Sequence, residues 1–190
     1  MIRLRKENKN SPEYFNTHFR GLSYVDMKRQ EKLASRFRGG IYVDIGCWDS
    51  PMPVLIADKF QKSKIYALDY AFDVIDELSR EFPKVRYTYI SDCCNLPFVD
   101  NSVDYIVAGE LIEHLDNPKL FIREALRVLK VNGTLAISTP KDEAHGNKLG
   151  GDLHIWSFDE DDMKELLTDC ELSSLKEGNY TSWIAFKIKK

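Results

Sequence analysis

The 190-residue sequence lacks the features that mark several common classes of protein. No apolar run approaches the roughly 18 residues that a membrane-spanning helix needs, so we expect no membrane partner. The four cysteines, Cys47, Cys93, Cys94 and Cys170, form no CxxC pair, which disfavours a disulfide framework and a zinc site. The net charge is −3, so the chain has no overall attraction for nucleic acid.

The first residues of the sequence do not show the pattern of an export signal. Residues 1–6 are basic but no apolar segment follows them, and we therefore expect a cytoplasmic protein. Basic residues at both ends could contact phosphate, although solvated termini are the simpler interpretation. The sequence has no internal repeat and no low-complexity segment, which predicts a single domain over residues 1–190. Nothing in the pattern indicates an oligomeric state.

Short apolar runs alternate with amphipathic segments from residue 41 onwards. Five runs have the length and composition of buried strands: 41–45, 64–69, 85–90, 103–108 and 134–138. Two further strands, at 172–177 and 182–189, are separated by Gly178-Asn179. This alternation predicts an α/β fold with a doubly wound, mostly parallel sheet, helices on both faces and an antiparallel last strand.

The N-terminal segment, residues 1–38, is polar with scattered aromatic residues. Asp26 has the position of an N-cap for a helix that ends near Phe37. We expect this segment to lie as a lid on the main domain, residues 41–190.

Capping patterns predict the bounds of two later helices. Asn117-Pro118 would open one of them with an N-cap and an N1 proline, and Asn132-Gly133 would close it. Ser157 stands three residues before Glu160, which is the pattern of a capping box at the start of another helix.

Acidic residues stand at or after the ends of the predicted strands: Asp44, Asp69, Asp92, Glu110 and Glu113. The carboxyl ends of parallel strands line the ligand crevice of a doubly wound sheet. Asp69 closes the second strand at a distance from the first turn that suits an acid holding a ribose diol. Such a rim suits a ligand with ribose hydroxyls, an exocyclic amine and positive charge.

The turn after the first strand, Gly46-Cys47-Trp48-Asp49-Ser50, lacks the GxGxxG pattern. A dinucleotide would place its pyrophosphate on this turn, where close approach needs glycine and Asp49 would repel the phosphates. The sequence therefore disfavours a nicotinamide dinucleotide oxidoreductase. S-adenosylmethionine fits better because it carries a sulfonium and an ammonium and no phosphate.

Several segments, in their order and spacing, resemble class I S-adenosylmethionine-dependent methyltransferases of the ubiquinone-biosynthesis-type, small-molecule branch. The resemblance runs from about Tyr42 to Leu167 and is carried by residues 43–47, 109–118 and 126–135. It implies a Rossmann-like sheet of seven strands in the order 3-2-1-4-5-7-6, and S-adenosylmethionine as the cofactor.

The resemblance also implies roles for residues around the crevice. Asp69 would hold both ribose hydroxyls, and Asp92 with Cys93 would meet the adenine amine and ring edge. The backbone at Gly46 would approach the methionine group. The predicted cofactor-binding set is Asp44, Gly46, Cys47, Trp48, Asp69, Tyr70, Asp92, Cys93 and Glu110.

Three positions in this set leave alternatives open. Asp44 could contact the cofactor or order the first turn. Tyr70 could pack against adenine or in the core. Trp48 stands where family members usually carry glycine, so its indole could line the pocket or narrow it.

A general base is needed only if the methyl acceptor is a hydroxyl or a protonated amine. His114, His145 and His154 are the candidates for this catalytic role, with Glu110 and Glu113 as further carboxylates. His114 could instead be structural, and the other two histidines could order the long loop that carries them. No HxxxH or HExxH spacing is present, so we expect no metal held by histidines.

The sequence thus predicts an S-adenosylmethionine-dependent methyltransferase that modifies an oxygen, nitrogen or carbon atom of a small molecule. The alternative is a protein of the same fold that binds S-adenosylmethionine or S-adenosylhomocysteine without catalysing transfer. Trp48 and the lack of an obvious base keep this alternative open.

Overall fold

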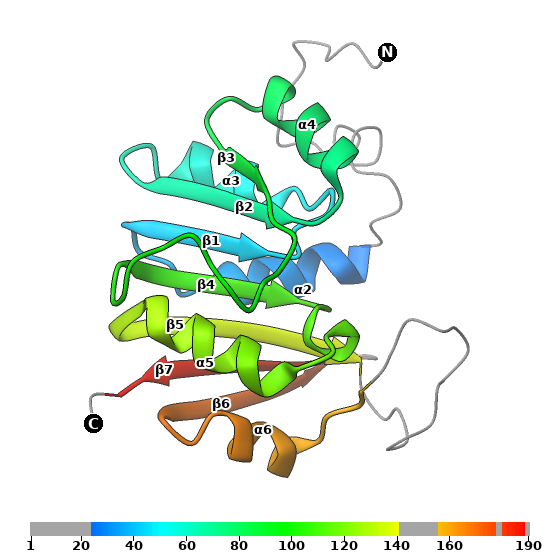
Figure 1. Cartoon of the computed structure of the whole chain (residues 1–190), viewed down its shortest axis with the longest axis vertical. Helices are drawn as coiled ribbons and strands as arrows, with labels where there is room; N and C mark the ends of the chain where they lie inside the picture. The colour runs from blue at the N-terminus through cyan, green and yellow to red at the C-terminus, as the bar shows by residue number, and fades with distance from the viewer. Residues whose placement is uncertain (1–23, 141–155, 178–179, 189–190) are drawn as a thin grey trace.

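The computed structural model describes residues 24–140, 156–177 and 180–188, which form a seven-stranded sheet (Figure 1). The strands lie in the order β3-β2-β1-β4-β5-β7-β6. β7 is antiparallel to both of its neighbours, and the other pairs are parallel. The strands are β1 (Ile41–Ile45), β2 (Lys64–Asp69), β3 (Arg86–Tyr89), β4 (Val103–Gly109), β5 (Leu129–Pro140), β6 (Cys170–Glu177) and β7 (Tyr180–Lys187). The predicted fold class and strand order are confirmed.

Helices cover both faces of this sheet. In Figure 1, α5 and α6 lie in front of the sheet and α2 and α3 lie behind it. The helices are α2 (Tyr24–Ala34), α3 (Met52–Lys59), α4 (Phe72–Glu81), α5 (Pro118–Val128) and α6 (Glu160–Leu166), with a short 3-10 helix, η1 (Ile112–His114). In the described part of the chain, no helix is long and apolar enough to cross a membrane.

Alternate residues of the central strands supply two separate cores. In β1, Tyr42 packs into the core under α2, α3 and α4, whereas Val43 and Ile45 belong to the core under α5 and α6. Leu33 of α2 and Phe121 of α5 are fully buried on opposite faces. Burial on both faces explains why the central strands are nearly continuous apolar runs in the sequence.

The capping prediction for α5 is right at its start and wrong at its end. The Asn117 side chain accepts a hydrogen bond from the amide of Leu120 at 3.0 Å. However, α5 ends at Val128, and β5 begins at once because Leu129 pairs with Val103 of β4. Asn132, with a φ of 64°, lies in an irregularity of β5 where the register with β4 shifts.

The predicted starts of α2 and α6 are also wrong. Asp26 lies inside α2, which begins at Tyr24. Asp159, and not Ser157, is the N-cap of α6, and it accepts the amides of Asp161 and Asp162 at 2.8 and 2.9 Å. Asp162 completes the capping box by accepting the amide of Asp159 at 2.9 Å. A carboxylate at this end also interacts favourably with the helix dipole.

The sheet has its topological switch point between β1 and β4. β1 pairs with β2 on one side and with β4 on the other, so the chain leaves these two strands toward opposite edges of the sheet. A crevice opens beyond the carboxyl ends of strands at such a point. The turns after Ile45 and Gly109 therefore position the candidate site.

Candidate functional site

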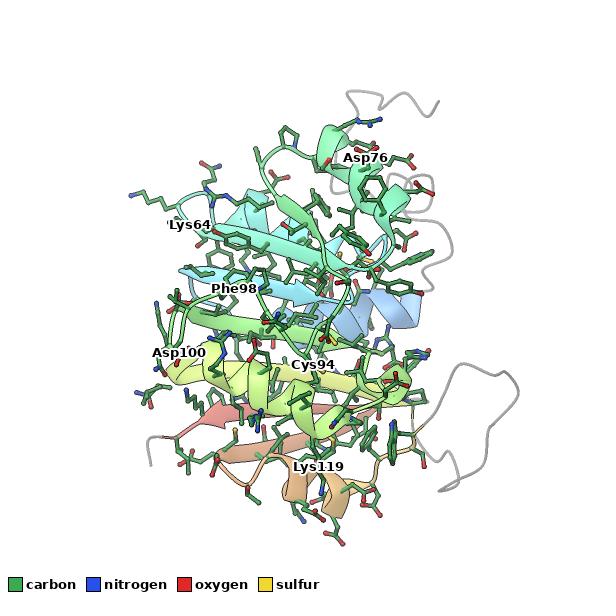
Figure 2. The ribbon with its side chains drawn as sticks, in the orientation of Figure 1. Lys64, Asp76, Cys94, Phe98, Asp100 and Lys119 are labelled. Carbon is green, nitrogen blue, oxygen red and sulfur yellow. The ribbon has the colours of Figure 1, made fainter. Side chains whose placement is uncertain are left out.

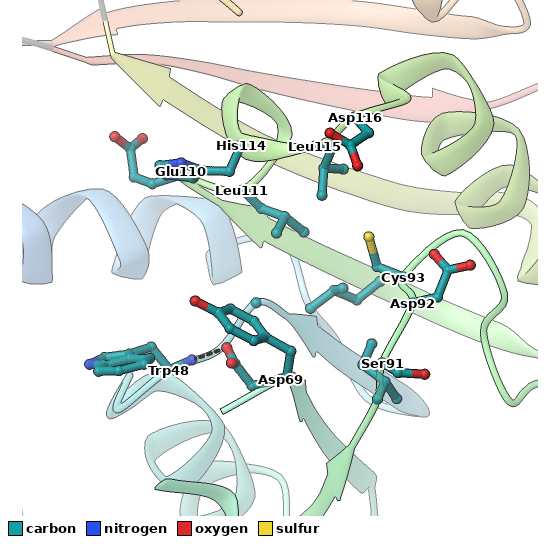
Figure 3. A pocket seen from close by; sticks show the side chains of 14 residues that line it. Trp48, Asp69, Ser91, Asp92, Cys93, Glu110, Leu111, His114, Leu115 and Asp116 are labelled. Carbon is teal, nitrogen blue, oxygen red and sulfur yellow. Dashed lines mark hydrogen bonds between the residues drawn. The ribbon is translucent and has the colours of Figure 1, made fainter. Parts of the chain in front are cut away.

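A cavity of about 680 Å³ lies at the switch point. This volume is typical of a pocket for a small molecule or cofactor. Its lining comes from the turns that follow β1, β2, β3 and β4 (Figure 3). The lining residues are Ile45, Gly46, Trp48, Asp69, Tyr70, Ile90, Ser91, Asp92, Cys93, Glu110, Leu111, His114, Leu115 and Asp116.

Asp69 is a buried carboxylate of the pocket that two backbone amides hold in place. It ends β2 and is only 4% exposed. One of its oxygens accepts the amide of Trp48 at 2.7 Å, the contact drawn in Figure 3, and the other accepts the amide of Ala71 at 2.9 Å. Each carboxylate oxygen keeps a further lone pair, so Asp69 can join the first turn to a ligand hydroxyl.

Asp92 and Cys93 lie on the side of the pocket away from Trp48 (Figure 3). They belong to the loop of residues 90–102, which carries Cys94 and Phe98 across the sheet (Figure 2). Asp92 is exposed, and one of its oxygens accepts the amide of Cys94 at 2.7 Å. Burial, followed by the charges of its neighbours, raises the pKa of Cys93 to about 12, so this thiol is protonated at neutral pH.

Side chains of helix α5 hold this loop through hydrogen bonds. Glu124 accepts the amide of Leu96 at 2.7 Å, and Arg127 donates to the carbonyl of Phe98 at 3.0 Å and to the carboxylate of Asp100 at 2.5 Å. The hydrogen bond from Arg127 lowers the pKa of Glu124, which keeps this carboxylate ionised. These contacts hold residues 96–100 of the loop against α5.

Glu110 closes the pocket on the side of α2. Arg29 of α2 forms an ion pair with its carboxylate at 2.9 Å, and the hydroxyl of Ser138 donates to the same oxygen at 2.9 Å. The Arg29 guanidinium also lies 4.4 Å from the ring centroid of Tyr180. The sequence pattern gave no signal for Arg29, because Glu110 and Tyr180, which it contacts, come from the turn after β4 and from β7.

Gly46 has a φ of 71°, and a Cβ atom built on it would lie 3.0 Å from a methyl group of Leu111. A side chain here would therefore be strained and would crowd the pocket lining.

Two residues of the predicted cofactor-binding set, Asp44 and Cys47, lie outside the pocket lining. Both are buried behind it, at 4% and 2% exposure. Burial, and then the nearby charge of Asp69, raises the pKa of Asp44 from 3.8 to about 8. Burial likewise raises the pKa of Cys47 well above its usual value. The remaining members of the set line the pocket, and the roles given to them stay predictions.

Of the three predicted catalytic histidines, His114 lies at the pocket and is exposed. Its neighbour Glu113 is buried, at 1% exposure. Trp156 begins the described segment 156–177, and its indole donates to the carbonyl of Leu115 at 2.7 Å. This hydrogen bond links that segment to the turn after β4. His145 and His154 lie outside the residues that the structure describes.

A cationic ligand suits the charge of this pocket. Four of its lining residues are acidic (Asp69, Asp92, Glu110 and Asp116), and none of the described lining residues is lysine or arginine. Such a lining raises the local concentration of cations and repels phosphate. The residues present therefore fit S-adenosylmethionine, whereas they do not fit a diphosphate.

Comparison with known proteins agrees with this geometry. The family model described as "Methyltransferase domain" matches residues 43–137. The chain belongs to the methyltransferase-domain family. This membership confirms the resemblance to class I S-adenosylmethionine-dependent methyltransferases, and the cofactor of that class is S-adenosylmethionine.

One curated relative, from Mycolicibacterium smegmatis, is named a probable S-adenosylmethionine-dependent methyltransferase. It is 32% identical over 110 residues, which are 58% of this chain and 42% of the relative. A relative named the same way in Mycobacterium tuberculosis matches over 39% of its length. The chain thus spans about two fifths of the length of these curated relatives.

Solved structures share the fold of this methyltransferase domain. A methyltransferase from Aquifex aeolicus has a TM-score of 0.65 at 21% identity and covers 84% of this chain and 89% of its own. The 1,6-didemethyltoxoflavin-N1-methyltransferase of Burkholderia thailandensis has a TM-score of 0.71 at 16% identity, with coverages of 85% and 77%. At these identities the likeness establishes the fold alone.

Trp48 is the main departure of this methyltransferase domain from the family pattern. It has a φ of 41°, in the left-handed region that favours glycine, which is the residue that the resemblance led us to expect here. Its indole is 52% exposed and lines the cavity, which remains open beside it. The indole thus lies at the wall of the cavity, and its part in cofactor binding stays a prediction. Tyr70, at 74% exposure, also lines the pocket and is not a core residue.

Tryptophan fluorescence can report on this position. Trp48 lines the pocket, where a ligand would contact it, whereas Trp183 is buried in the core. We expect S-adenosylhomocysteine to change the emission of the wild-type chain, and Trp48→Phe to remove most of that change. Trp156→Phe is the control and should preserve it. An undiminished change in Trp48→Phe would contradict contact between ligand and indole.

Proposed function

We propose that the protein is an active S-adenosylmethionine-dependent methyltransferase that modifies an oxygen, nitrogen or carbon atom of a small-molecule acceptor. The observation that carries the proposal is the pair of carboxylates Asp69 and Asp92. Asp69 ends β2, and Asp92 follows β3, the next strand along the chain. Both line one cavity, where the described lining residues include no lysine or arginine. Carboxylates in this arrangement suit the ribose and the adenine amine of a positively charged nucleoside.

The residues of the pocket would act mainly by orienting the two substrates. Asp69 would accept the ribose hydroxyls, Asp92 the adenine amine, and Gly46 would admit the methionine group next to its backbone. S-adenosylmethionine supplies the methyl group already activated on a sulfonium. The chain then has to hold the acceptor in line with that group and exclude water from the reacting atoms.

His114 is the described residue best placed to take a proton from the acceptor. It is exposed and lines the cavity from η1, at the carboxyl end of β4. A neutral imidazole there could accept the proton of a hydroxyl or an ammonium as the new bond forms. His145 and His154 stay candidates for the same role.

Several features support a small acceptor. The sequence resembles the small-molecule branch of the family, and the related structure from Burkholderia thailandensis holds 1,6-didemethyltoxoflavin with S-adenosylhomocysteine. In this chain the exposed rings of Trp48 and Tyr70 line the cavity and offer flat surfaces to an aromatic or conjugated acceptor.

A cytoplasmic location remains an expectation, in keeping with four free cysteines.

Turnover tests this proposal. Purified protein is incubated with S-adenosylmethionine and a panel of phenols, amines, carboxylic acids and activated carbon acids, and release of S-adenosylhomocysteine is measured. We expect at least one acceptor to accelerate release, and His114→Gln to reduce the rate without weakening S-adenosylhomocysteine binding. Tight binding of both adenosyl ligands with no turnover on the panel would instead favour the non-catalytic binding protein.

A further inference from the structure

Three metal-binding side chains meet at the edge of the pocket. The carboxylate of Asp92 and the sulfur atoms of Cys93 and Cys94 all lie within 4.8 Å of one another. Four-coordinate zinc with sulfur ligands at about 2.3 Å places neighbouring ligand atoms about 3.8 Å apart. The three atoms would have to approach one another by up to about 1 Å to share one ion.

The backbone that carries the three side chains is already ordered. The amide of Cys94 donates to Asp92 at 2.7 Å, which closes a tight turn around the cluster. The next residues are held by Glu124 and Arg127 of α5, as described above. A site on a fixed turn loses little conformational entropy when a ligand binds. Cys93 and Cys94 are only half-buried, and Asp92 is exposed, so an ion can reach them.

We propose that Asp92, Cys93 and Cys94 form a binding site for a thiophilic divalent cation, of which Zn²⁺ is the physiological example. Two sulfurs and one carboxylate oxygen are the donor set of a soft or borderline ion rather than of Mg²⁺ or Ca²⁺. Each thiol would release its proton to solvent as its sulfur binds the metal, and water would complete the coordination. The sequence pattern disfavoured zinc because the cysteines form no CxxC pair and the histidines have no metal-binding spacing.

The cation site overlaps the pocket. Asp92 and Cys93 both line the cavity, and Asp92 is the residue proposed to accept the adenine amine. An ion bound to this carboxylate would occupy the acceptor atoms that the cofactor needs. We therefore expect the cation and S-adenosylhomocysteine to exclude each other, and this part of the inference rests on the proposed function.

Cadmium titration tests the cation site, because Cd²⁺ bound to thiolate gives an ultraviolet charge-transfer band. We expect one Cd²⁺ per chain in the reduced protein, and loss of the band in the double variant Cys93→Ser/Cys94→Ser. Cys170→Ser, which changes a half-buried cysteine outside the cluster, should keep the band. Asp92→Asn keeps both thiols and should weaken Cd²⁺ binding by about tenfold or more. A band that survives in the double variant, or that Asp92→Asn leaves unchanged, would overturn the site.

Addition of S-adenosylhomocysteine to the cadmium-loaded protein tests the overlap. We expect the band to disappear as the ligand saturates, and Cd²⁺ to weaken ligand binding in return. Simultaneous saturation by both would overturn mutual exclusion. If S-adenosylhomocysteine fails to bind even the cation-free protein, the proposed function fails, and the cadmium titration of the variants still decides the cation site alone.

Discussion

Replacing Asp69 by alanine is expected to lower the affinity for S-adenosylhomocysteine by about 1–3 kcal/mol, or about 5- to 150-fold in the dissociation constant. Two losses contribute. The ribose hydroxyls lose a charged acceptor, and the amide of Trp48 loses the partner that fixes the first turn of the pocket. Asp69 is 4% exposed, so we expect water to compensate poorly for the lost carboxylate. Calorimetric or thermal-shift titration measures the change.

Asp73→Ala is the matched control for this substitution. Asp73 is an exposed carboxylate in the first turn of α4, four residues from Asp69, and it does not line the pocket. Its removal should leave the dissociation constant within about twofold, as surface changes outside a site usually do. Equal losses in both variants would indicate a general electrostatic effect, and an unchanged constant in Asp69→Ala would refute the ribose role.

The second large effect is a dependence of the free energy of unfolding on pH, which arises from Asp44. Its folded-state pKa is raised from 3.8 to about 8, chiefly by burial and then by Asp69. Between these two values the folded chain keeps a proton that the unfolded chain has lost. The free energy of unfolding therefore falls as pH rises through this window. From about pH 5 to about pH 8 we expect a loss of roughly 2–4 kcal/mol relative to Asp44→Asn, whose side chain does not ionise.

Chemical unfolding of both proteins across this pH range measures the difference. The wild type should lose stability relative to the variant as pH rises toward about 8. The difference between them should level off below about pH 3, where Asp44 is protonated in both the folded and the unfolded chain. Asp73→Ala again serves as the control, because its carboxylate is exposed. Parallel pH profiles for wild type and Asp44→Asn would show that Asp44 is ionised in the folded protein.

The sequence predicted the sheet well because both faces of its central strands are buried. Tyr42 and Val43 face opposite cores, so both positions must be apolar, and β1 appears as an apolar run broken only by Asp44. The pocket was predicted in outline for a related reason. Asp69 and Asp92 stand where buried strands end, and parallel strands bring those ends to one edge of the sheet.

Features that depend on contacts distant in sequence could not be predicted in the same way. The pairing of Leu129 with Val103 ends α5 four residues before the Asn-Gly turn that local pattern favoured. The ion pair of Arg29 with Glu110 joins two residues that are far apart in the chain. The proximity of Asp92, Cys93 and Cys94 side-chain atoms is a matter of loop conformation, and adjacent cysteines match none of the spaced zinc patterns.

Isothermal titration of the wild-type protein with S-adenosylmethionine and with NAD tests the central claim most directly. The acidic pocket predicts one saturable site per chain for S-adenosylmethionine, weakened in Asp69→Ala and retained in Asp73→Ala, with no heat of binding from NAD. Saturable binding of NAD, together with no binding of S-adenosylmethionine, would contradict the account.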